Sequence, residues 1–307
     1  MKAAWRWPGL LAIALLLAAC GGRHATRPPA GGSAAVTKSR HGWFHHDGVR
    51  DDTRLPQSRR YRDNDDSTPA GAPPSFIAKL PEPVPKVEPR SLYGNKSPYS
   101  VRGQSYRVLP SARGYDERGI ASYYGNKFNG YKTSSLENYD MYKFSAASKV
   151  LPLPSYARVT NLANGKSVVV RVNDRGPFHE NRIIDLSYAA AVRIGIWPKG
   201  TGLVEVQGID PSAPARELPA PPVVTGGVAH PGIYLQVGAF ADPANADRVA
   251  QQLRRARLAP VQVVDAVVGG RHVRRVRLGP LADADAADRI SDKIVRMGLP
   301  HPEVAVD

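Results

Sequence analysis

The chain has 307 residues, 42 of them lysine or arginine and 27 aspartate or glutamate, for a formal net charge of +15, and it contains one cysteine. At roughly 100–200 residues per domain this length allows about two domains, and one cysteine excludes both a disulfide framework and a cysteine-based zinc site. No run of about 18 apolar residues occurs beyond the N-terminus, so we expect no internal transmembrane helix.

Residues 1–19 have the composition of a secretory signal peptide. Two basic residues precede an apolar run over residues 10–17, and two alanines stand directly before Cys20. A chance cysteine at the end of the leader is one interpretation. The other is that residues 17–20 resemble the bacterial lipobox, which implies acylation of Cys20 and a lipid anchor, with palmitate-type chains, in a membrane. Because no aspartate follows the cysteine, the resemblance favours the outer membrane, on its periplasmic side.

Residues 20–118 are rich in proline, arginine, serine and aspartate and show little periodicity. Such a composition buries too little apolar surface to offset the entropy of ordering, which predicts a lipidated, flexible tether with local order near residues 106–109. A second linker rich in proline and glycine is predicted over residues 211–231. Two folded domains are left, residues 119–210 and residues 232–307.

Much of the positive charge, +7 of the total, falls in residues 21–118. Nucleic-acid binding needs cations clustered on a folded face, and export also argues against it, so we expect no nucleic-acid partner. An anionic membrane surface or an acidic cell-wall polymer fits a basic tether better, and a tether that is merely solvated is an equal alternative.

Short β-strands account for most of the first predicted domain. An asparagine-glycine turn at residues 164–165 joins two of them into a hairpin. A helix is expected over residues 187–194, with Gly195 at its C-terminal cap. The predicted strands are residues 119–124, 156–161 and 167–172. This pattern predicts a compact, mainly β barrel with one or two short helices.

Three acids in this domain could carry chemistry: Glu137, Asp140 and Asp174. Asp174 ends a strongly β run just before a glycine-proline turn, where a strand end holds a carboxylate at the edge of a loop-lined groove. Cleavage of a glycosidic bond needs one carboxyl that stays protonated near neutral pH, and a second charged group can stabilise the developing oxocarbenium ion. The alternative is structural, because Asp174 could pair with Arg175 or cap the turn.

Several uncommon peptides resemble the bacterial rare lipoprotein A family. They are GIASYYG at 119–125, LPLPSY at 151–156, VTNL at 159–162, VRVNDRGPF at 170–178 and RIIDLS at 182–187. The resemblance implies a double-psi β-barrel and endolytic lytic transglycosylation of peptidoglycan strands that lack stem peptides. In that reaction the C6 hydroxyl of N-acetylmuramic acid closes on C1 and leaves a 1,6-anhydro end, so no cofactor is needed.

The resemblance also implies roles for individual residues. Asp174 would be the acid and base, and Glu137 and Asp140 would shape the site, orient sugar hydroxyls or tune the pKa of Asp174. Three further residues are expected to contact the sugar, although the first two could instead hold the loop: Asn173, Arg175 and Tyr123.

Two departures from the family pattern put catalysis in question. Ser148 stands where the family has a histidine, and Leu136 stands where it has a glycine. Serine does not titrate near neutral pH. Either the histidine is auxiliary, or the protein binds glycan without cleaving it. His179 and the pair His45–His46 lack other ligands at zinc spacing, so no metal site is expected.

Residues 232–307 contain an internal repeat of strand, helix and strand. Apolar side chains recur at helical spacing over residues 245–258 and 284–297. The order predicts a ferredoxin-like α/β sandwich with helices on one face of the sheet. The segments around Gln236 and Arg277 resemble the sporulation-related repeat domain, which implies binding to stem-free glycan through these residues, with aromatics such as Tyr234 stacking on sugar rings.

The leading hypothesis is therefore an endolytic lytic transglycosylase anchored by lipid and enriched at the division septum, where it remodels the cell wall and helps daughter cells separate. The first alternative is a non-catalytic septal glycan-binding lipoprotein. The second is a scaffold whose basic tether binds protein partners, which the sequence does not identify.

Overall fold

The computed structural model describes residues 51–55, 57–61, 66–179, 181–213 and 232–306. The expected signal peptide, Cys20, the pair His45–His46 and nearly all of the second linker lie outside the described residues. Among the described residues, no helix combines the length and the apolar character needed to cross a membrane.

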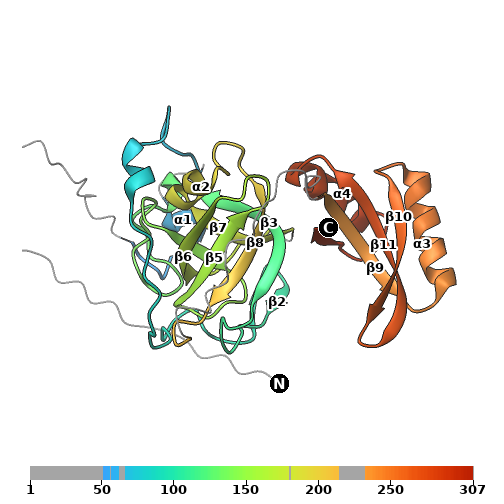
Figure 1. Ribbon diagram of the computed structural model, residues 1–307, viewed down its shortest axis with the longest axis horizontal. Coiled ribbons are helices and arrows are strands. Elements are labelled where there is room, and N and C mark those ends of the chain that lie inside the picture. Colours follow the sequence, from blue (N-terminus) through green and yellow to red (C-terminus); the bar gives the residue numbers. More distant parts are fainter. Residues whose placement is uncertain (1–50, 56, 62–65, 180, 214–231, 307) are drawn as a thin grey trace, which may run out of the picture. The chain divides into compact units, whose positions relative to one another are not determined.

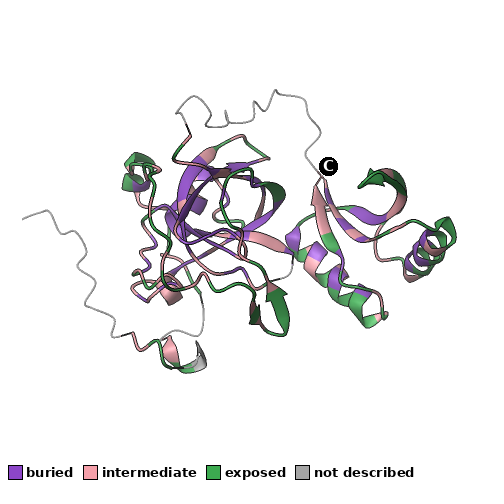
Figure 2. Ribbon diagram, turned by 90° about the horizontal axis from the view of Figure 1, so that it is seen from below, coloured by how far each residue is buried: buried purple, intermediate pink, exposed green. Residues whose placement is uncertain are grey.

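Six strands close into the predicted barrel (Figure 1). In barrel order they are β3 (Asp116–Tyr124), β7 (Arg182–Ser187), β4 (Ser145–Ser148), β6 (Ser167–Asp174), β5 (Ser155–Asn161) and β8 (Gly202–Ile209). The pairs β3–β7 and β4–β6 are parallel and the other pairs are antiparallel. Strands β5 and β6 form the hairpin that the turn predicts, and buried residues concentrate in the barrel strands (Figure 2).

The short helix α2 (Tyr188–Ile194) has the caps that the sequence indicates. The Ser187 hydroxyl accepts a hydrogen bond from the Ala190 amide, and Gly195 adopts a left-handed conformation with φ 73° at the other end. Three consecutive alanines of the helix are completely buried, which lets its backbone lie close to the barrel core.

Residues 66–118 differ from the expected flexible tether, because they lie along the barrel and complete its core. This segment contains η1 (Ser75–Lys79) and the hairpin of β1 (Tyr99–Val101) and β2 (Gln104–Tyr106), and α1 (Gln57–Arg60) precedes it. Ile77 is 1% exposed and belongs to the barrel core. Arg193 donates to the carbonyls of Ile77 and Leu80 at 3.0 and 2.7 Å. The segment has the average composition of a linker. It is nevertheless fixed to the barrel by single buried apolar side chains and by hydrogen bonds from barrel side chains to its backbone.

The C-terminal domain confirms the predicted α/β sandwich. Its elements are β9 (Ile233–Phe240), α3 (Pro243–Ala256), β10 (Val261–Val268), β11 (Arg271–Leu281), α4 (Ala284–Arg296) and β12 (Glu303–Val306). The antiparallel sheet has the order β10-β11-β9-β12. Leu235 and Leu278 are completely buried together with Ala250, Leu253 and Ile294 of the two helices, and these side chains pack in one hydrophobic cluster.

Candidate active site

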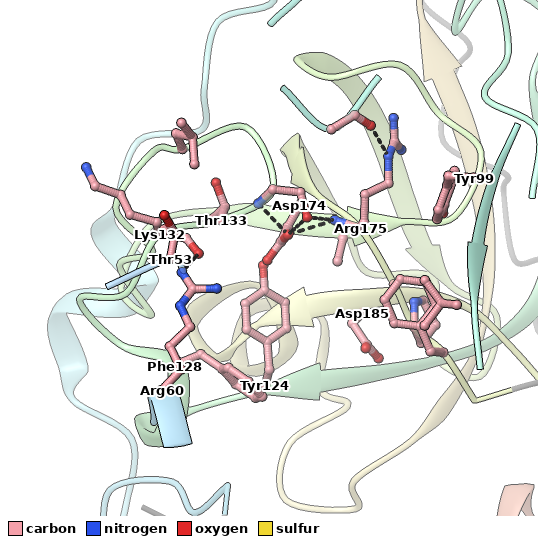
Figure 3. A pocket seen from close by; sticks show the side chains of 18 of the residues that line it. Thr53, Arg60, Tyr99, Tyr124, Phe128, Lys132, Thr133, Asp174, Arg175 and Asp185 are labelled. Carbon is pink, nitrogen blue, oxygen red and sulfur yellow. Dashed lines mark hydrogen bonds between the residues drawn. The ribbon is translucent and has the colours of Figure 1, made fainter. Parts of the chain in front are cut away.

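A cavity of about 550 Å³ opens at one end of the barrel. Its lining comes from the ends of β3, β4, β6 and β7, the loop 132–136, and segments that precede the barrel in sequence. Figure 3 shows Asp174, Arg175, Asp185 and Tyr124 around this cavity. The structure thus brings one predicted acid and one predicted sugar contact into a cavity that also holds residues absent from the sequence prediction.

Asp174 is the last residue of β6, and its carboxyl is held from one side. Oδ1 accepts hydrogen bonds from the Ser134 amide at 2.8 Å, the Ser134 hydroxyl at 2.6 Å and the Arg175 amide at 2.7 Å. Burial raises the pKa of Asp174 above its usual range, although the bonds from Ser134 oppose this effect. Within the described part of the chain these bonds all end on Oδ1, so Oδ2 is the oxygen that can carry a proton.

Asp185 is a second, partly buried acid in the same cavity, and it is not among the acids that the sequence predicts. It accepts a hydrogen bond from the Ser122 hydroxyl, and burial raises its pKa. Ala147 of β4 is the register partner of Asp174 on one side and of Asp185 on the other. The two acids therefore flank one strand. The signal available in the sequence was one acid between apolar residues, in the run IIDL at residues 183–186.

Tyr124, rather than Tyr123, lines the cavity. Alternate residues of a strand face opposite sides, and Tyr123 packs partly buried against the hydrophobic core. The hydroxyl end of Tyr124 points toward Asp174 in Figure 3 and has no hydrogen-bond partner among the described residues. Burial, with the Asp174 charge as a smaller contribution, raises the pKa of this phenol well above its usual value. The phenol therefore stays neutral at neutral pH.

Glu137 and Asp140 do not line the cavity. Glu137 binds Arg171 at 2.6 Å and accepts a bond from the Asn173 amide nitrogen at 3.0 Å. Burial raises the pKa of Glu137, but these partners outweigh burial and leave it below the usual value. Asp140 accepts a bond from the Tyr142 amide at 2.9 Å and so caps a turn. Glu137 is thus held in its ionised form, and neither carboxyl contacts Asp174.

Asn173 and Arg175 form hydrogen bonds within the protein. Asn173 is buried and supports Glu137. The Arg175 guanidinium lines the cavity but donates to the carbonyls of Gly94 at 2.6 Å, Ser148 at 2.9 Å and Leu151 at 2.5 Å. Burial lowers the pKa of Arg175 to about 10, so it remains charged at neutral pH. Its bonds join the segment before β1 to the loop after β4.

The two departures from the family pattern have clear local structures. Ser148 is 1% exposed, and its hydroxyl accepts bonds from the amides of Val150 and Leu151 at 3.2 and 3.1 Å. It therefore caps a turn and does not line the cavity. Leu136 has φ 64°, a left-handed conformation that favours glycine. His179 does line the cavity, and no group of metal-ligand type that could hold an ion occurs among the described residues.

In the C-terminal domain Gln236 of β9 and Arg277 of β11 are direct cross-strand partners. Their neighbours Leu235 and Leu278 point into the helix-covered core, so this pair lies on the opposite face of the sheet. Tyr234, two residues before Gln236, lies on the same face. The structure thus brings together the residues that the sequence predicts as a glycan-binding surface.

Comparisons with known proteins match both domains. The Lytic transglycolase family model matches residues 116–207, and the SPOR domain model matches residues 229–301. The endolytic peptidoglycan transglycosylase RlpA of Pseudomonas aeruginosa strain PAO1 is 39% identical over 277 residues, which covers 74% of this chain and 80% of that protein. The RlpA of Vibrio cholerae is 40% identical over 239 residues, covering 78% and 86%. A crystal structure of the RlpA SPOR domain from P. aeruginosa is 39% identical and covers 24% of this chain and 97% of that one, with a TM-score of 0.23. The chain therefore belongs to the endolytic peptidoglycan transglycosylase RlpA family.

Proposed function

We propose that this chain cleaves peptidoglycan glycan strands by endolytic lytic transglycosylation and leaves 1,6-anhydro-N-acetylmuramic acid ends. The observation that carries the proposal is the carboxyl of Asp174, buried at a cavity in the barrel of a member of this family. A carboxyl whose pKa is raised retains its proton closer to neutral pH, which a general acid requires.

Asp174 would serve both proton transfers. As the bond between C1 of N-acetylmuramic acid and the glycosidic oxygen breaks, Oδ2 gives its proton to that oxygen and positive charge develops at C1. The C6 hydroxyl of the same sugar then bonds to C1 while the Asp174 carboxylate accepts the hydroxyl proton. The acid is regenerated and no water is consumed.

Asp185 suits the electrostatic part of the reaction. It lies across Ala147 from Asp174 and faces the same cavity. When ionised, it would stabilise the positive charge that develops at C1. Two buried carboxyls near one substrate do not both ionise readily, so one acid and one carboxylate are the favoured pair.

Aromatic rings on the cavity wall would bind the sugars. Tyr61 packs edge-to-face on Phe128 at 4.9 Å between ring centroids, and Tyr99 and Phe178 lie 6.5 Å apart. All four line the cavity. Such rings offer apolar faces to the C–H faces of pyranoses while the polar groups between them bind hydroxyls.

The match of the C-terminal domain to the SPOR domain model supports the same substrate, because such a domain would add a second glycan-binding surface to the chain. We propose that it enriches the protein on septal strands lacking stem peptides, and that Cys20 carries lipid that holds the chain at the outer membrane, facing the periplasm. Neither a nucleic acid nor a cofactor is part of this proposal.

The test is mass spectrometry of the products formed from stem-free glycan strands by the full chain. We expect anhydro-ended fragments, and we expect Asp174→Asn to lower the rate by about 10²–10⁴-fold. Asp116→Asn, an exposed acid on β3 away from the cavity, is the matched control and should retain full activity. Reducing ends would show hydrolysis, and would contradict the proposal.

A non-catalytic glycan-binding lipoprotein is the second candidate, favoured by Ser148, which cannot supply the titrating group that the family has there. Strands that are bound by the full chain and released unchanged would support it. A scaffold role for the basic N-terminal region is tested by deleting residues 21–50, since a longer deletion would remove part of the barrel core. Loss of septal targeting with unchanged glycan affinity would support that role.

A further inference from the structure

The cavity wall carries three cationic side chains for which the described part of the chain provides no ion-pair partner. Lys96 and Arg102 lie on the segment before β1 and at the β1–β2 turn, and Lys132 lies on the loop after η2 (Asn126–Phe128). Among the described residues none of the three forms an ion pair or a side-chain hydrogen bond. Lys132 interacts electrostatically with Asp51, but Arg60 binds the Asp51 carboxylate at 2.7 and 2.5 Å and has the larger effect on it.

The other charged side chains that line the cavity already have partners within the protein. Arg60 is occupied by Asp51, and Arg175 is occupied by backbone carbonyls. Asp174 and Asp185 are partly buried and accept hydrogen bonds from serine hydroxyls. The rim of the cavity, formed by Lys96, Arg102 and Lys132, is therefore positively charged, while Asp174 and Asp185 lie deeper in the cavity. Unbalanced charge of one sign in a cleft attracts ligands of the opposite sign.

The proposed substrate has one ionised group that fits this rim. In a glycan strand of alternating N-acetylglucosamine and N-acetylmuramic acid, the lactyl side chain of the latter ends in a carboxylate when the stem peptide is absent. When the peptide is present, the same carbon is an amide, neutral and bulky. A cationic rim would attract the lactyl carboxylate of the first form, whereas the amide of the second form offers no charge at that position.

We propose that Lys96, Arg102 and Lys132 bind the lactyl carboxylates of N-acetylmuramic acid and thereby select strands without stem peptides. This inference rests on the proposed function, since it names the feature of that substrate which the cavity recognises. The three side chains are specificity determinants and take no part in proton transfer.

The experiment compares stem-free strands with the same strands after carbodiimide coupling of their lactyl carboxylates to methylamine. The full chain is measured on both, by kcat/KM and, with Asp174→Asn, by the dissociation constant. We expect the kcat/KM of the parent to be at least about tenfold lower on the amidated strands than on the native strands. The Lys132→Met substitution should lower kcat/KM about fivefold on the native strands and hardly at all on the amidated strands. A fivefold loss is what the removal of one partly screened ion pair implies.

Lys166→Met is the matched control, because Lys166 is exposed on the β5–β6 turn and does not line the cavity. This substitution should leave kcat/KM unchanged on both kinds of strand. Equal performance of the parent on both strands, or equal losses of Lys132→Met on both, would overturn the inference. Absence of cleavage together with discrimination in binding would refute the proposed function while leaving this inference in place.

Discussion

Replacing Ile77 by alanine tests whether the segment before the barrel belongs to the folded domain. Ile77 is 1% exposed and lies in the barrel core, and its carbonyl accepts a bond from Arg193. The substitution removes three carbon atoms, worth roughly 0.8 kcal/mol each in transfer free energy. A cavity term adds to this, so we expect a loss of about 3 kcal/mol, within the range found for Ile→Ala in cores.

Hydrogen exchange measured by mass spectrometry in increasing urea reports the stability of the barrel peptides separately from the rest of the chain. Val84→Ala is the matched control, because Val84 belongs to the same segment and is 81% exposed. It should change the free energy of unfolding of the barrel by less than about 0.5 kcal/mol. Equal small effects of both substitutions would refute the reasoning and return the segment to the status of a tether.

Three further outcomes follow from the site. Burial raises the pKa of Asp174 above its value in the unfolded chain. The contribution of Asp174 to stability is therefore complete below the unfolded-state pKa and is lost as the pH rises through the folded-state pKa. Urea titrations of the barrel should show this loss of stability in the parent and a smaller loss in Asp174→Asn. Leu136→Gly should raise the stability of the barrel by about 0.5 kcal/mol. At φ 64° leucine is strained in the folded state, and this strain costs more free energy than the extra chain entropy of glycine in the unfolded state. A decrease in stability would show that Leu136 is not strained. Ser148→Ala should cost about 1 kcal/mol, because two buried amides lose their acceptor, and an unchanged urea midpoint would rule out the capping role.

The sequence predicted elements whose signals are local. Helix α2 follows from its alanines, its serine N-cap and Gly195, and the C-terminal sandwich follows from a repeat of two apolar helix faces. The mainly β barrel followed from β-branched runs and a tight turn, and its double-psi form from family peptides. These features depend on neighbours within about ten residues, which a sequence displays directly.

The parts that could not be predicted depend on distant pairing. Ile77 stands in a short apolar stretch, Phe76 to Ala78, inside a proline-rich region, and only the folded barrel supplies the core that buries it. Asp185 joins Asp174 because β4 pairs with both β6 and β7, and no local pattern encodes that register. In the dipeptide of Tyr123 and Tyr124, composition cannot reveal which ring faces inward.

The position of Ala147 between two acids makes their separation a property of the backbone. Neighbouring strands lie about 4.8 Å apart, so the chains that carry Asp174 and Asp185 are held roughly 9–10 Å apart by β4. Loops around the rim can therefore vary in length and charge, and so change which polymer enters, without altering the distance between the two carboxyl-bearing strands. Selection of substrate and the geometry of bond cleavage can evolve separately in this barrel.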